Sequence, residues 1–502
     1  MKLLFSSFSR HEPSKLGYGA LSMGFLLLSF CYLSLLFKSH QIPSPNLNLQ
    51  VENVSKKVED GDPPTSKKVE EGDSPTSSQH GLQFKAEIQP TVEILPICNT
   101  KNKRFDICKL EGDIRIHPNS STIFLLTSSP PSSWGLPVGR NSWKIQPYVR
   151  KGDVTAMQNV KDITVKPFES SVITSNSSLE NLSYYVKIPK CTVRHEIPAI
   201  IFSTGGYTGN LFHDFTDVLV PLYITSHRFD REVQFVISDM NIWWIRKFQH
   251  ILKQLSGHDP VNFGDEAEVH CFSSAIAGLE FHRELGTHAG KLQNTSSNEL
   301  RTESMFDFRA LLRRAYFLER ERVVLEGGRK PRLLLINRSR SRKFENAKEI
   351  MRRSEKLGYE VVTVEANWST NMTLLAQIVN SCDVMVGVHG AGLTNMVLLP
   401  AGAVVIQIVP LGRLEGLASY DFGDPAVAMD LHYLDYRIKP EESSLIKEIP
   451  RDDPALVDPI SLHKKGWGAL RTVYLDKQDV RVDLRRFEKV LKKAKMLLYS
   501  RA

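Results

Sequence analysis

The chain has 502 residues, 41% of them hydrophobic and 24% charged, with a formal net charge of +8. This length exceeds one ordinary hydrophobic core, so we expect two folded domains with appendages. The modest positive charge is compatible with an acidic small-molecule ligand. The sequence contains no arginine-rich or lysine-rich block of the kind that binds nucleic acid, which excludes that class of partner.

Close to the start of the chain, residues 16–37 form one uncharged apolar segment. About twenty such residues span a bilayer as a helix. Lys2, Arg10 and Lys15 precede the segment, which predicts a cytosolic tail at 1–15, a signal-anchor at 16–37 and a luminal remainder. This is the topology of a single-pass type II membrane protein, and a cleaved signal peptide is the alternative.

Asn-x-Ser/Thr sequons occur at a density that suits a protein of the secretory pathway. We expect glycosylation at Asn53, Asn119, Asn176, Asn181, Asn294, Asn367 and Asn371. A further sequon, at Asn337, ends an apolar strand and is not expected to be glycosylated.

Five of the six cysteines lie outside the membrane segment. In an oxidising lumen Cys98–Cys108 is the easiest local disulfide, and Cys191–Cys271 could be a second, although spacing alone does not fix the connectivity. Cys382 borders an apolar strand and is expected to remain a free core thiol. No cysteine and histidine spacing resembles a zinc site.

The residues from 38 to 90 are polar and contain a near-duplicate, Lys56–Ser66 followed by Lys67–Ser77. So little apolar surface cannot offset the entropy of ordering the segment. We predict a disordered luminal stalk between the membrane and a folded region.

Two α/β halves are predicted after the stalk, an N-terminal one at 91–325 and a C-terminal one at 326–502. The first carries expected strands at 121–126, 199–203 and 233–238 and expected helices at 211–225 and 242–255. The second alternates regularly, with strands at 332–337, 359–364, 383–388 and 403–409 and helices at 345–357 and 372–381. Continuous apolar strands that alternate with helices indicate parallel, Rossmann-type sheets, and nucleotides commonly bind in the cleft between two such domains.

A glycine loop follows the strand at 383–388 and reads His389-Gly390-Ala391-Gly392. A strand that leads through glycines into a helix collects unpaired backbone N–H groups and the positive helix end at one point. This pattern predicts an anion site at the carboxyl edge of a sheet. The alternative is a tight turn without a ligand.

Arginines follow the strand at 332–337 in the run Arg338-Ser339-Arg340-Ser341-Arg342. Their forked donors match phosphate oxygens, and their position beyond a strand end is where a diphosphate would lie. A solvated basic loop is the alternative.

His213 and Asp217 are separated by four residues in a predicted helix and should share one face. An imidazole held by a carboxylate is a plausible general base, with Asp214 beside it. The alternative is a buried polar network of His213 with Asp214 and Thr216. The only Asp-x-Asp motif, Asp60-Gly61-Asp62, lies in the stalk, so a metal-independent reaction is expected.

These motifs together resemble the family 61 glycosyltransferases, its plant members in particular. The resemblance covers roughly residues 97–502 and rests on the following stretches: Ile97–Asn99 through Gly112–Arg115, Gly209–Asp217, Arg338 with Arg342, Asn346 and Glu349, His389–Asn395, and Val473-Tyr474 with the last helix. Family members are inverting enzymes of the Golgi or endoplasmic reticulum with a two-domain GT-B type fold.

The resemblance implies roles for individual residues. Donor binding is implied for Arg338, Arg342, Asn346, His389, Gly390, Ala391, Gly392, Thr394 and Asn395. Acceptor activation is implied near His213 and Asp217, without a choice between them as the base.

The resulting hypothesis is an inverting, Golgi membrane-anchored transferase that moves arabinofuranose or xylose from a UDP-sugar to xylan, without a cofactor. Other xylan synthases of the Golgi are possible partners. The alternatives are an N-glycan core xylosyltransferase, another UDP-sugar transferase of the secretory pathway, or a non-catalytic luminal protein that binds carbohydrate or nucleotide.

Overall fold

The computed structural model describes residues 97–128, 131–136, 141–169, 188–264, 267–287, 304–365 and 370–500. All of these residues belong to one compact unit, 90–502. The predicted signal-anchor at 16–37 and stalk at 38–90 lie outside the described residues. Within the described ranges, no helix has the length and apolar character needed to cross a membrane.

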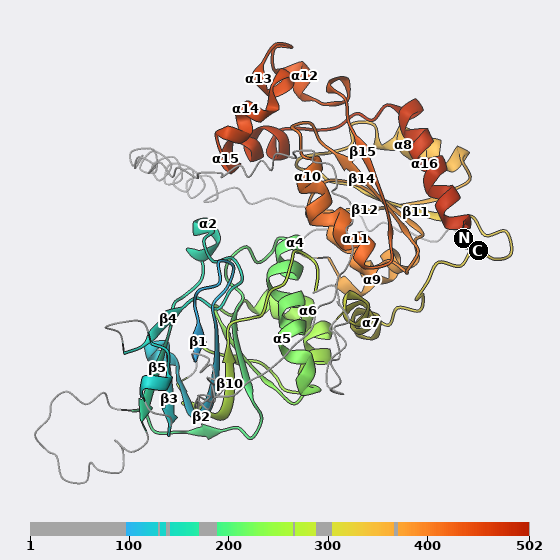
Figure 1. The fold of residues 1–502 in the computed structure, drawn as a ribbon. Helices are drawn as coiled ribbons and strands as arrows, with labels where there is room; N and C mark the ends of the chain where they lie inside the picture. The colour runs from blue at the N-terminus through green and yellow to red at the C-terminus, as the bar shows by residue number, and fades with distance from the viewer. Residues whose placement is uncertain are drawn as a thin grey trace, which may run out of the picture. The chain divides into compact units, whose positions relative to one another are not determined.

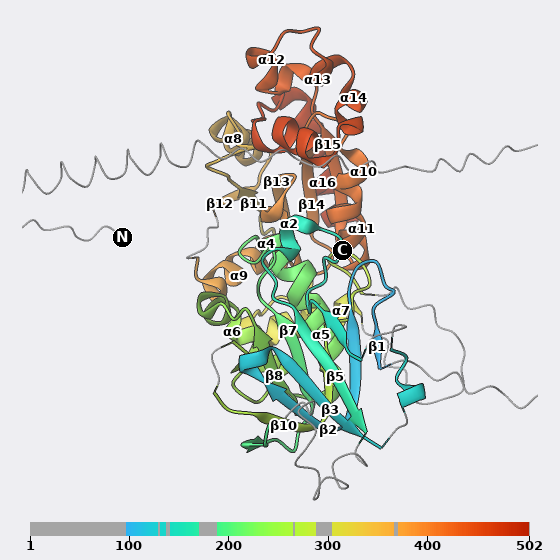
Figure 2. The same cartoon turned by 90° about the vertical axis from the view of Figure 1, so that its left-hand side faces the viewer.

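The first sheet has ten strands (Figures 1 and 2). Its main path runs in the order β4-β5-β3-β2-β10-β7-β8-β9, with β1 paired to β2 and β6 paired to β10. The strands are β1 (Cys98–Asn99), β2 (Ile107–His117), β3 (Thr122–Thr127), β4 (Trp143–Ile145), β5 (Ile163–Glu169), β6 (Val193–Arg194), β7 (Ala199–Ser203), β8 (Gln234–Ser238), β9 (Val261–Asn262) and β10 (His270–Ala277).

Only part of this sheet is of the predicted Rossmann type. One part of it is parallel and consists of β9, β8, β7 and β10, side by side in that sequence. Numbered by their position in the chain, these four strands have the order 3-2-1-4. Beyond β10 the sheet becomes mixed, because β2 runs antiparallel to both β10 and β3. The prediction of a purely Rossmann-type first half is therefore wrong. The short turn at Pro118–Ser121 makes β2 and β3 antiparallel, since such a turn can join only antiparallel strands, and β2 then pairs antiparallel with β10, far away in the chain.

The helices of this half are α2 (Val154–Met157), α4 (Leu211–His213), α5 (Val220–Ser226), α6 (Ile242–Leu255) and α7 (Met305–Tyr316). Strand β7 and helix α6 have the predicted bounds. The single helix predicted at 211–225 is instead interrupted between α4 and α5 by a π-helical segment, η3 (Asp214–Leu219). Segments of this kind are often found at functional sites.

The second sheet is entirely parallel, with the order β12-β11-β13-β14-β15. Its strands are β11 (Arg332–Ile336), β12 (Glu360–Val364), β13 (Val384–Val388), β14 (Val404–Val409) and β15 (His432–Arg437). Numbered by their position in the chain, these five strands have the order 2-1-3-4-5, which is that of a doubly wound fold. The strand order reverses between β11 and β13. The prediction of a Rossmann-type sheet is confirmed for this half.

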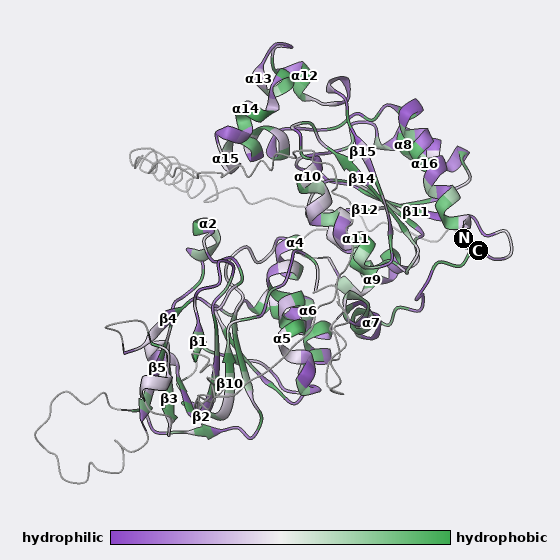
Figure 3. Ribbon diagram, in the orientation of Figure 1, coloured by the Kyte–Doolittle hydropathy of each residue, from purple (hydrophilic) through white to green (hydrophobic). Residues whose placement is uncertain are grey.

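Helices and helical turns accompany the second sheet. They are α8 (Ala347–Lys356), α9 (Met372–Asn380), the 3-10 helix η5 (Ala391–Leu398), α10 (Glu415–Ala418), the π-helical segment η6 (Ser419–Gly423), α11 (Asp424–Ala428), α12 (Leu445–Glu448), α13 (Pro454–Val457), α14 (Pro459–Lys464), α15 (Trp467–Leu470), the π-helical segment η8 (Arg471–Asp476) and α16 (Leu484–Tyr499). Hydrophobic and hydrophilic residues alternate along α16 (Figure 3), and Phe487, Leu491, Ala494 and Leu498 form its buried face against β14 and β15.

One hydrophobic core is shared by residues of both sheets. Helix α7 contributes the buried Arg309, whose guanidinium donates to the backbone oxygens of Val397, Leu399 and Met429. The predicted boundary at 325–326 lies in the chain between β10 and β11 and stays a prediction.

Both predicted disulfides, Cys98–Cys108 and Cys191–Cys271, are present, and Cys382 is the predicted buried free thiol. Cys98 and Cys108 face each other across the β1–β2 pair. The bond from Cys191 joins the segment before β6 to β10.

Candidate functional site

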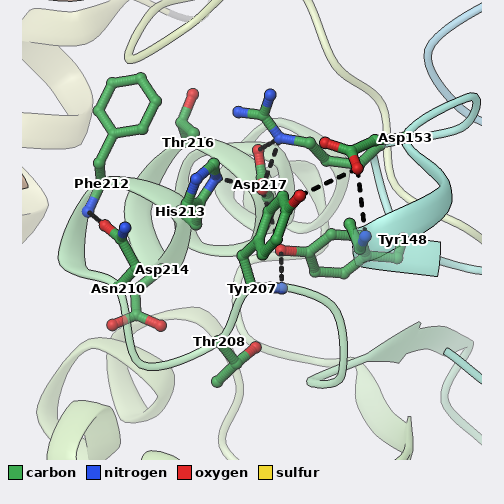
Figure 4. A network of polar contacts seen from close by, with 12 residues as sticks. Tyr148, Asp153, Tyr207, Thr208, Asn210, Phe212, His213, Asp214, Thr216 and Asp217 are labelled. Atoms are coloured by element: carbon green, nitrogen blue, oxygen red, sulfur yellow. Dashed lines mark hydrogen bonds and ion pairs between the residues drawn. The ribbon is translucent and has the colours of Figure 1, made fainter. Parts of the chain in front are cut away.

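His213 and Asp217 meet in the structure as predicted (Figure 4). His213 ends α4, Asp217 lies in η3, and His213 Nδ1 is 2.9 Å from Asp217 Oδ2. The ring of Tyr207 packs on the imidazole with centroids 4.6 Å apart. Among the described residues, His213 Nε2 has no hydrogen-bond partner, so this nitrogen remains open to a ligand. We call His213 and Asp217 the dyad.

Asp217 is fully buried, and its oxygens are fully engaged. Tyr148 donates its hydroxyl to Oδ2 at 2.9 Å, and Arg150 Nε donates to both oxygens at 3.0 and 2.9 Å. Burial alone would raise the pKa of Asp217, but the hydrogen bond from His213 and the charge of Arg150 outweigh it, so this pKa is lowered. A permanently ionised and saturated carboxylate orients an imidazole rather than accepting a proton itself.

Glu284 joins this network, although the sequence analysis did not single it out. It accepts from Arg104 at 2.6 Å, from Arg150 at 3.2 Å and from the Thr216 hydroxyl at 2.7 Å. Glu284 follows β10, which neighbours β7 where the order of the first sheet reverses. The position after a strand at such a reversal is the signal that could have pointed to it.

Asp214 does not join the dyad. Its Oδ1 accepts from the backbone N–H of Gly209 and from Trp244 Nε1, both at 2.9 Å, and the residue is fully buried. Burial raises the pKa of Asp214 to about 6. The predicted catalytic placement is therefore corrected: this side chain ties the loop before α4 to helix α6.

Arg338 and Arg342 form the second part of the site, which we call the arginine pair. Both are half-buried, and the loop that carries them follows β11. Arg342 donates to the backbone oxygen of His389 at 2.7 Å, and Arg338 Nε donates to the oxygen of Ser341 at 2.8 Å. Among the described residues, neither guanidinium has a carboxylate within ion-pair distance.

Burial and mutual repulsion act on these two cations. Burial lowers the pKa of Arg338, and burial together with the charge of Arg338 lowers the pKa of Arg342 to about 9. Both stay charged at neutral pH. Gly390, with φ 134°, lets the chain pass beside them, since a Cβ there would lie 2.6 Å from Arg342 Nη1. Two adjacent half-buried cations, with no carboxylate within ion-pair distance in the described part of the chain, indicate a site for an anion.

Three predicted donor residues are buried in the fold. Asn346 is buried, and its side-chain amide makes two hydrogen bonds with the backbone of Val482. Its Nδ2 donates to the Val482 oxygen at 2.9 Å, and its Oδ1 accepts from the Val482 N–H at 3.1 Å. Thr394 and Asn395 are buried in η5, and Asn395 Nδ2 donates to the oxygen of Gly392. The direct donor contact predicted for Asn346 is corrected to a structural one.

His389 lies in a chain of polar groups that ends near the dyad. Gln407 Nε2 is 2.8 Å from His389 Nδ1, and the Tyr433 hydroxyl donates to Gln407 Oε1 at 2.7 Å. Burial lowers the pKa of His389 to about 3, so the ring is neutral. Its Nε2 is 3.9 Å from Asp421 Oδ2, in η6.

Asp421 was not predicted from the sequence. Burial, together with the negative charge of Glu284, raises the pKa of this carboxyl to about 7. The η6 segment also reaches α4, because the rings of Phe212 and Phe422 are 5.5 Å apart. Helix α4 packs against η5 as well, which brings the dyad and the glycine loop together.

A cavity of about 580 Å³ lies between Arg338, the glycine loop and the start of α4, the helix that carries His213. Residues of both sheets' loops line it: Gly209, Asn210 and Leu211 before and in α4, Lys247 of α6, Asn337, Arg338 and Arg340 after β11, Glu365 after β12, and Ala391 and Gly392 of the glycine loop. It lies where the order of the second sheet reverses, between β11 and β13. We call it the switch-point cavity.

The remaining predictions concern metals and glycans. No cluster of His, Cys, Asp and Glu side chains suited to a metal ion occurs in the described part of the chain. The sequon residues Asn119 and Asn371 are exposed, while Asn53, Asn176, Asn181, Asn294 and Asn367 lie outside the described residues. Glycosylation stays a prediction.

Comparisons with known proteins agree with this geometry. The model of the family described as Glycosyltransferase 61 matches residues 211–406, which include the dyad, the arginine pair and the glycine loop. From Oryza sativa subsp. japonica, the alpha-1,3-arabinosyltransferase XAT3 is 43% identical over 80% of this chain and 65% of its own length. The beta-1,2-xylosyltransferase XYXT1 of the same organism is 39% identical, over 80% of this chain and 84% of its own. The xylan glycosyltransferase MUCI21 of Arabidopsis thaliana is 37% identical over 78% of each chain.

Two limits apply to these similarities. The chain spans slightly less than two thirds of the length of the two arabinosyltransferases XAT3 and XAT2, 65% and 63% respectively. Among solved structures, the heptosyltransferase TibC aligns with a TM-score of 0.24 at 11% identity, covering 66% of this chain and 78% of its own, which is too low to support an argument.

The named relatives are glycosyltransferases. The 39% identity to XYXT1 across 84% of that relative shows the family. The chain belongs to glycosyltransferase family 61.

Proposed function

We propose that the chain is an inverting glycosyltransferase that moves a pentose, arabinofuranose or xylose, from a UDP-sugar to a hydroxyl group of xylan. The names of the relatives support the pentose and the xylan acceptor. One observation carries the proposal: an oriented imidazole lies on a helix that packs against the glycine loop, and this loop lies beside two half-buried guanidiniums that have no carboxylate within ion-pair distance among the described residues.

His213 is the proposed general base. Its Nδ1 is bound to the ionised Asp217, which holds the hydrogen on Nδ1 and leaves Nε2 as the acceptor. The acceptor hydroxyl gives its proton to Nε2 while its oxygen forms a bond to the anomeric carbon of the donor. Asp217 then stabilises the imidazolium, and Arg150 holds Asp217 in position.

The arginine pair is the proposed site of the leaving diphosphate. The bond between the anomeric carbon and the phosphate oxygen breaks on the face opposite the attacking oxygen, and its electron pair remains on UDP. Arg338, Arg342 and the backbone N–H groups of the glycine loop offset the developing negative charge. Inversion follows because the base and the diphosphate act on opposite faces of the sugar.

The nucleoside is placed in the switch-point cavity, whose volume of about 580 Å³ falls within the usual range for small-molecule sites. In this arrangement the reaction needs no metal ion or cofactor, because arginines neutralise the diphosphate. The GT-B type arrangement, with an acceptor domain at 91–325 and a donor domain at 326–502, is part of the same proposal.

The proposed location is the Golgi membrane, with single-pass type II topology and a luminal catalytic region. The apolar segment at 16–37 and the sequons support it. Treatment of the protein from secreting cells with an endoglycosidase should increase its gel mobility. An unglycosylated protein, or one cleaved near residue 40, would contradict this topology.

The decisive experiment is a donor and acceptor screen. UDP-arabinofuranose, UDP-xylose and UDP-GlcNAc are each incubated with the purified chain and xylo-oligosaccharides or an N-glycan acceptor. We expect transfer of one pentose to xylo-oligosaccharides and to no other acceptor. Transfer to the N-glycan would favour the core xylosyltransferase alternative, and UDP binding without turnover would favour the non-catalytic one.

A further inference from the structure

A second cavity, of about 400 Å³, lies at the carboxyl edge of the first sheet. Loops after three consecutive parallel strands form it, those after β7, β8 and β9, together with the segment before β5. The side chains that matter for the argument are those of Asn159, Lys161, Thr208, Asp239, Asn241 and Asn262. Neither the dyad nor the arginine pair lines this space, which we call the polar cavity.

Amide, hydroxyl and ammonium groups dominate its wall. Asp239 is held in place, since its Oδ2 accepts from the Ser203 hydroxyl at 2.8 Å and from the backbone N–H of Lys161 at 3.1 Å. The ammonium of Lys161 has no carboxylate within ion-pair distance in the described part of the chain. Such a wall offers donors and acceptors to a ligand rich in hydroxyl groups rather than an apolar surface.

An exposed tryptophan, Trp243, lines a separate cavity of about 500 Å³ and follows the polar-cavity residue Asn241 closely in the chain. Trp243 is 40% exposed, although aromatic rings of this size are usually covered. It lies two residues after Asn241, and a Cβ on Gly209 would be 3.4 Å from its ring. The ring therefore lies against the loop between Thr208 of the polar cavity and Gly209 of the switch-point cavity. A flat exposed ring beside polar groups suits a sugar ring, which has both apolar and polar faces.

The loop from Gly205 to Leu211 connects this space to the reaction centre. Gly205, Gly206 and Thr208 line the polar cavity, whereas Gly209 and Leu211 line the switch-point cavity. Tyr207, between the two sets, packs on His213. A polymer that occupies the polar cavity can therefore present another of its sugars to His213.

We propose that the polar cavity and Trp243 form a subsite for the acceptor chain, which binds uncharged pentose units of xylan beyond the unit that receives the transferred sugar. This inference rests on the proposed function. The subsite makes the enzyme select long acceptors, because a short oligosaccharide that reaches His213 does not extend into it.

The test compares acceptor lengths. Lys161→Ala and Trp243→Ala in the full chain are assayed with xylo-oligosaccharides from the shortest accepted one upwards, and UDP binding is measured separately. Lys253→Ala, an exposed lysine of α6, and Trp467→Ala, an exposed tryptophan of α15, are the matched controls.

We expect each subsite variant to raise KM for long acceptors roughly tenfold, the scale of one lost charged hydrogen bond or aromatic contact. KM for the shortest acceptor, kcat and UDP affinity should stay unchanged, as should all values for the controls. Because both side chains are at the surface, the melting temperature should be that of the wild type.

Equal effects on short and long acceptors, or no effect on either, would overturn the subsite while leaving the proposed function intact. A wild-type chain that uses no xylo-oligosaccharide of any length would overturn the proposed function and this inference with it.

Discussion

On the first sheet, the buried charges of the site are paired with one another: Asp217 with Arg150 and His213, and Glu284 with Arg104 and Arg150. On the second sheet, Arg338 and Arg342 lie half-buried side by side, with no carboxylate within ion-pair distance among the described residues, and they repel each other. The first arrangement is complete in the absence of a substrate. The second gains its missing negative charge only when a ligand binds. The half on the first sheet is therefore preorganised for proton transfer, whereas the half on the second sheet is built around a ligand.

The largest expected effect tests the preorganised half. His213→Ala should lower kcat by roughly 10²–10⁴, as the removal of a general base does, and leave UDP affinity nearly unchanged. Steady-state kinetics and titration calorimetry with UDP give the two values. Loss of UDP binding in this variant, with full binding in an Arg338 variant, would reverse the assignment of the two halves.

A stability comparison tests the pairing directly. Arg150→Met removes one partner of a buried ion-pair network and should lower the free energy of unfolding by about 3–5 kcal/mol. Arg342→Met removes a partly buried cation that has no carboxylate within ion-pair distance among the described residues, so it should be close to neutral or stabilising. Denaturant unfolding without ligand measures both. Equal destabilisation by the two substitutions would show that the arginine pair is compensated by the protein after all.

The carboxyl group of Asp421 makes the free energy of unfolding depend on pH. Its pKa is raised from 3.8 to about 7, so its ionisation costs free energy in the folded state only. Asp421→Asn should therefore gain stability relative to the wild type as pH rises from about 4 to 7, by on the order of 3 kcal/mol, and the gain should level off above that range. Asp214, which has a raised pKa too, is present in both proteins and cancels in the difference. A difference that is flat with pH would contradict the assigned shift.

On the ligand-dependent half, Arg338→Ala should weaken UDP binding by about 1.5–3 kcal/mol, the scale of a lost charge-assisted hydrogen bond. Arg352→Ala is the control, because this exposed arginine of α8 belongs to the same half and carries the same charge. Calorimetry should show unchanged affinity for the control. Similar losses in the two variants would point to long-range charge rather than to a binding site.

The smallest expected effect is that of chelation. Arginines and backbone N–H groups neutralise the diphosphate in the proposed reaction, so EDTA should leave the transfer rate unchanged. The rate is measured before and after dialysis against EDTA. Complete loss of activity, with recovery on addition of Mn²⁺, would show that a metal ion shares the neutralisation with the arginine pair.

The sequence predicts those parts of the molecule that depend on local pattern. Apolar strand periodicity gave β7 and the second sheet, and the four-residue spacing gave the contact of His213 with Asp217. It missed β15, because this strand has partly polar, half-exposed positions. It also missed the mixed character of the first sheet, which depends on pairing between β2 and β10, far apart in the chain.

Residues that reach the site only through tertiary contacts could not be predicted from local sequence patterns. Glu284 and Asp421 lie in a loop and a π-helical segment without a recognisable motif, and only the fold brings them to the dyad. Asn346 illustrates the opposite error. It stands near the arginine pair in sequence, yet its side chain is engaged by Val482, more than a hundred residues later.

The hydrogen bonds between Asn346 and Val482 belong to a longer series of contacts between the arginine loop and a segment near the C-terminus. The backbone N–H of Arg342 donates to the oxygen of Gln478. The N–H of Val480 donates to the oxygen of Lys343, and the oxygen of Val480 accepts from the N–H of Glu345. The arginine loop is thus held from behind by a strip of chain near the C-terminus. A protein shortened to end before Gln478 would keep both arginines but lose their support, so a frameshift or an added tag in this strip would act as a donor-site mutation.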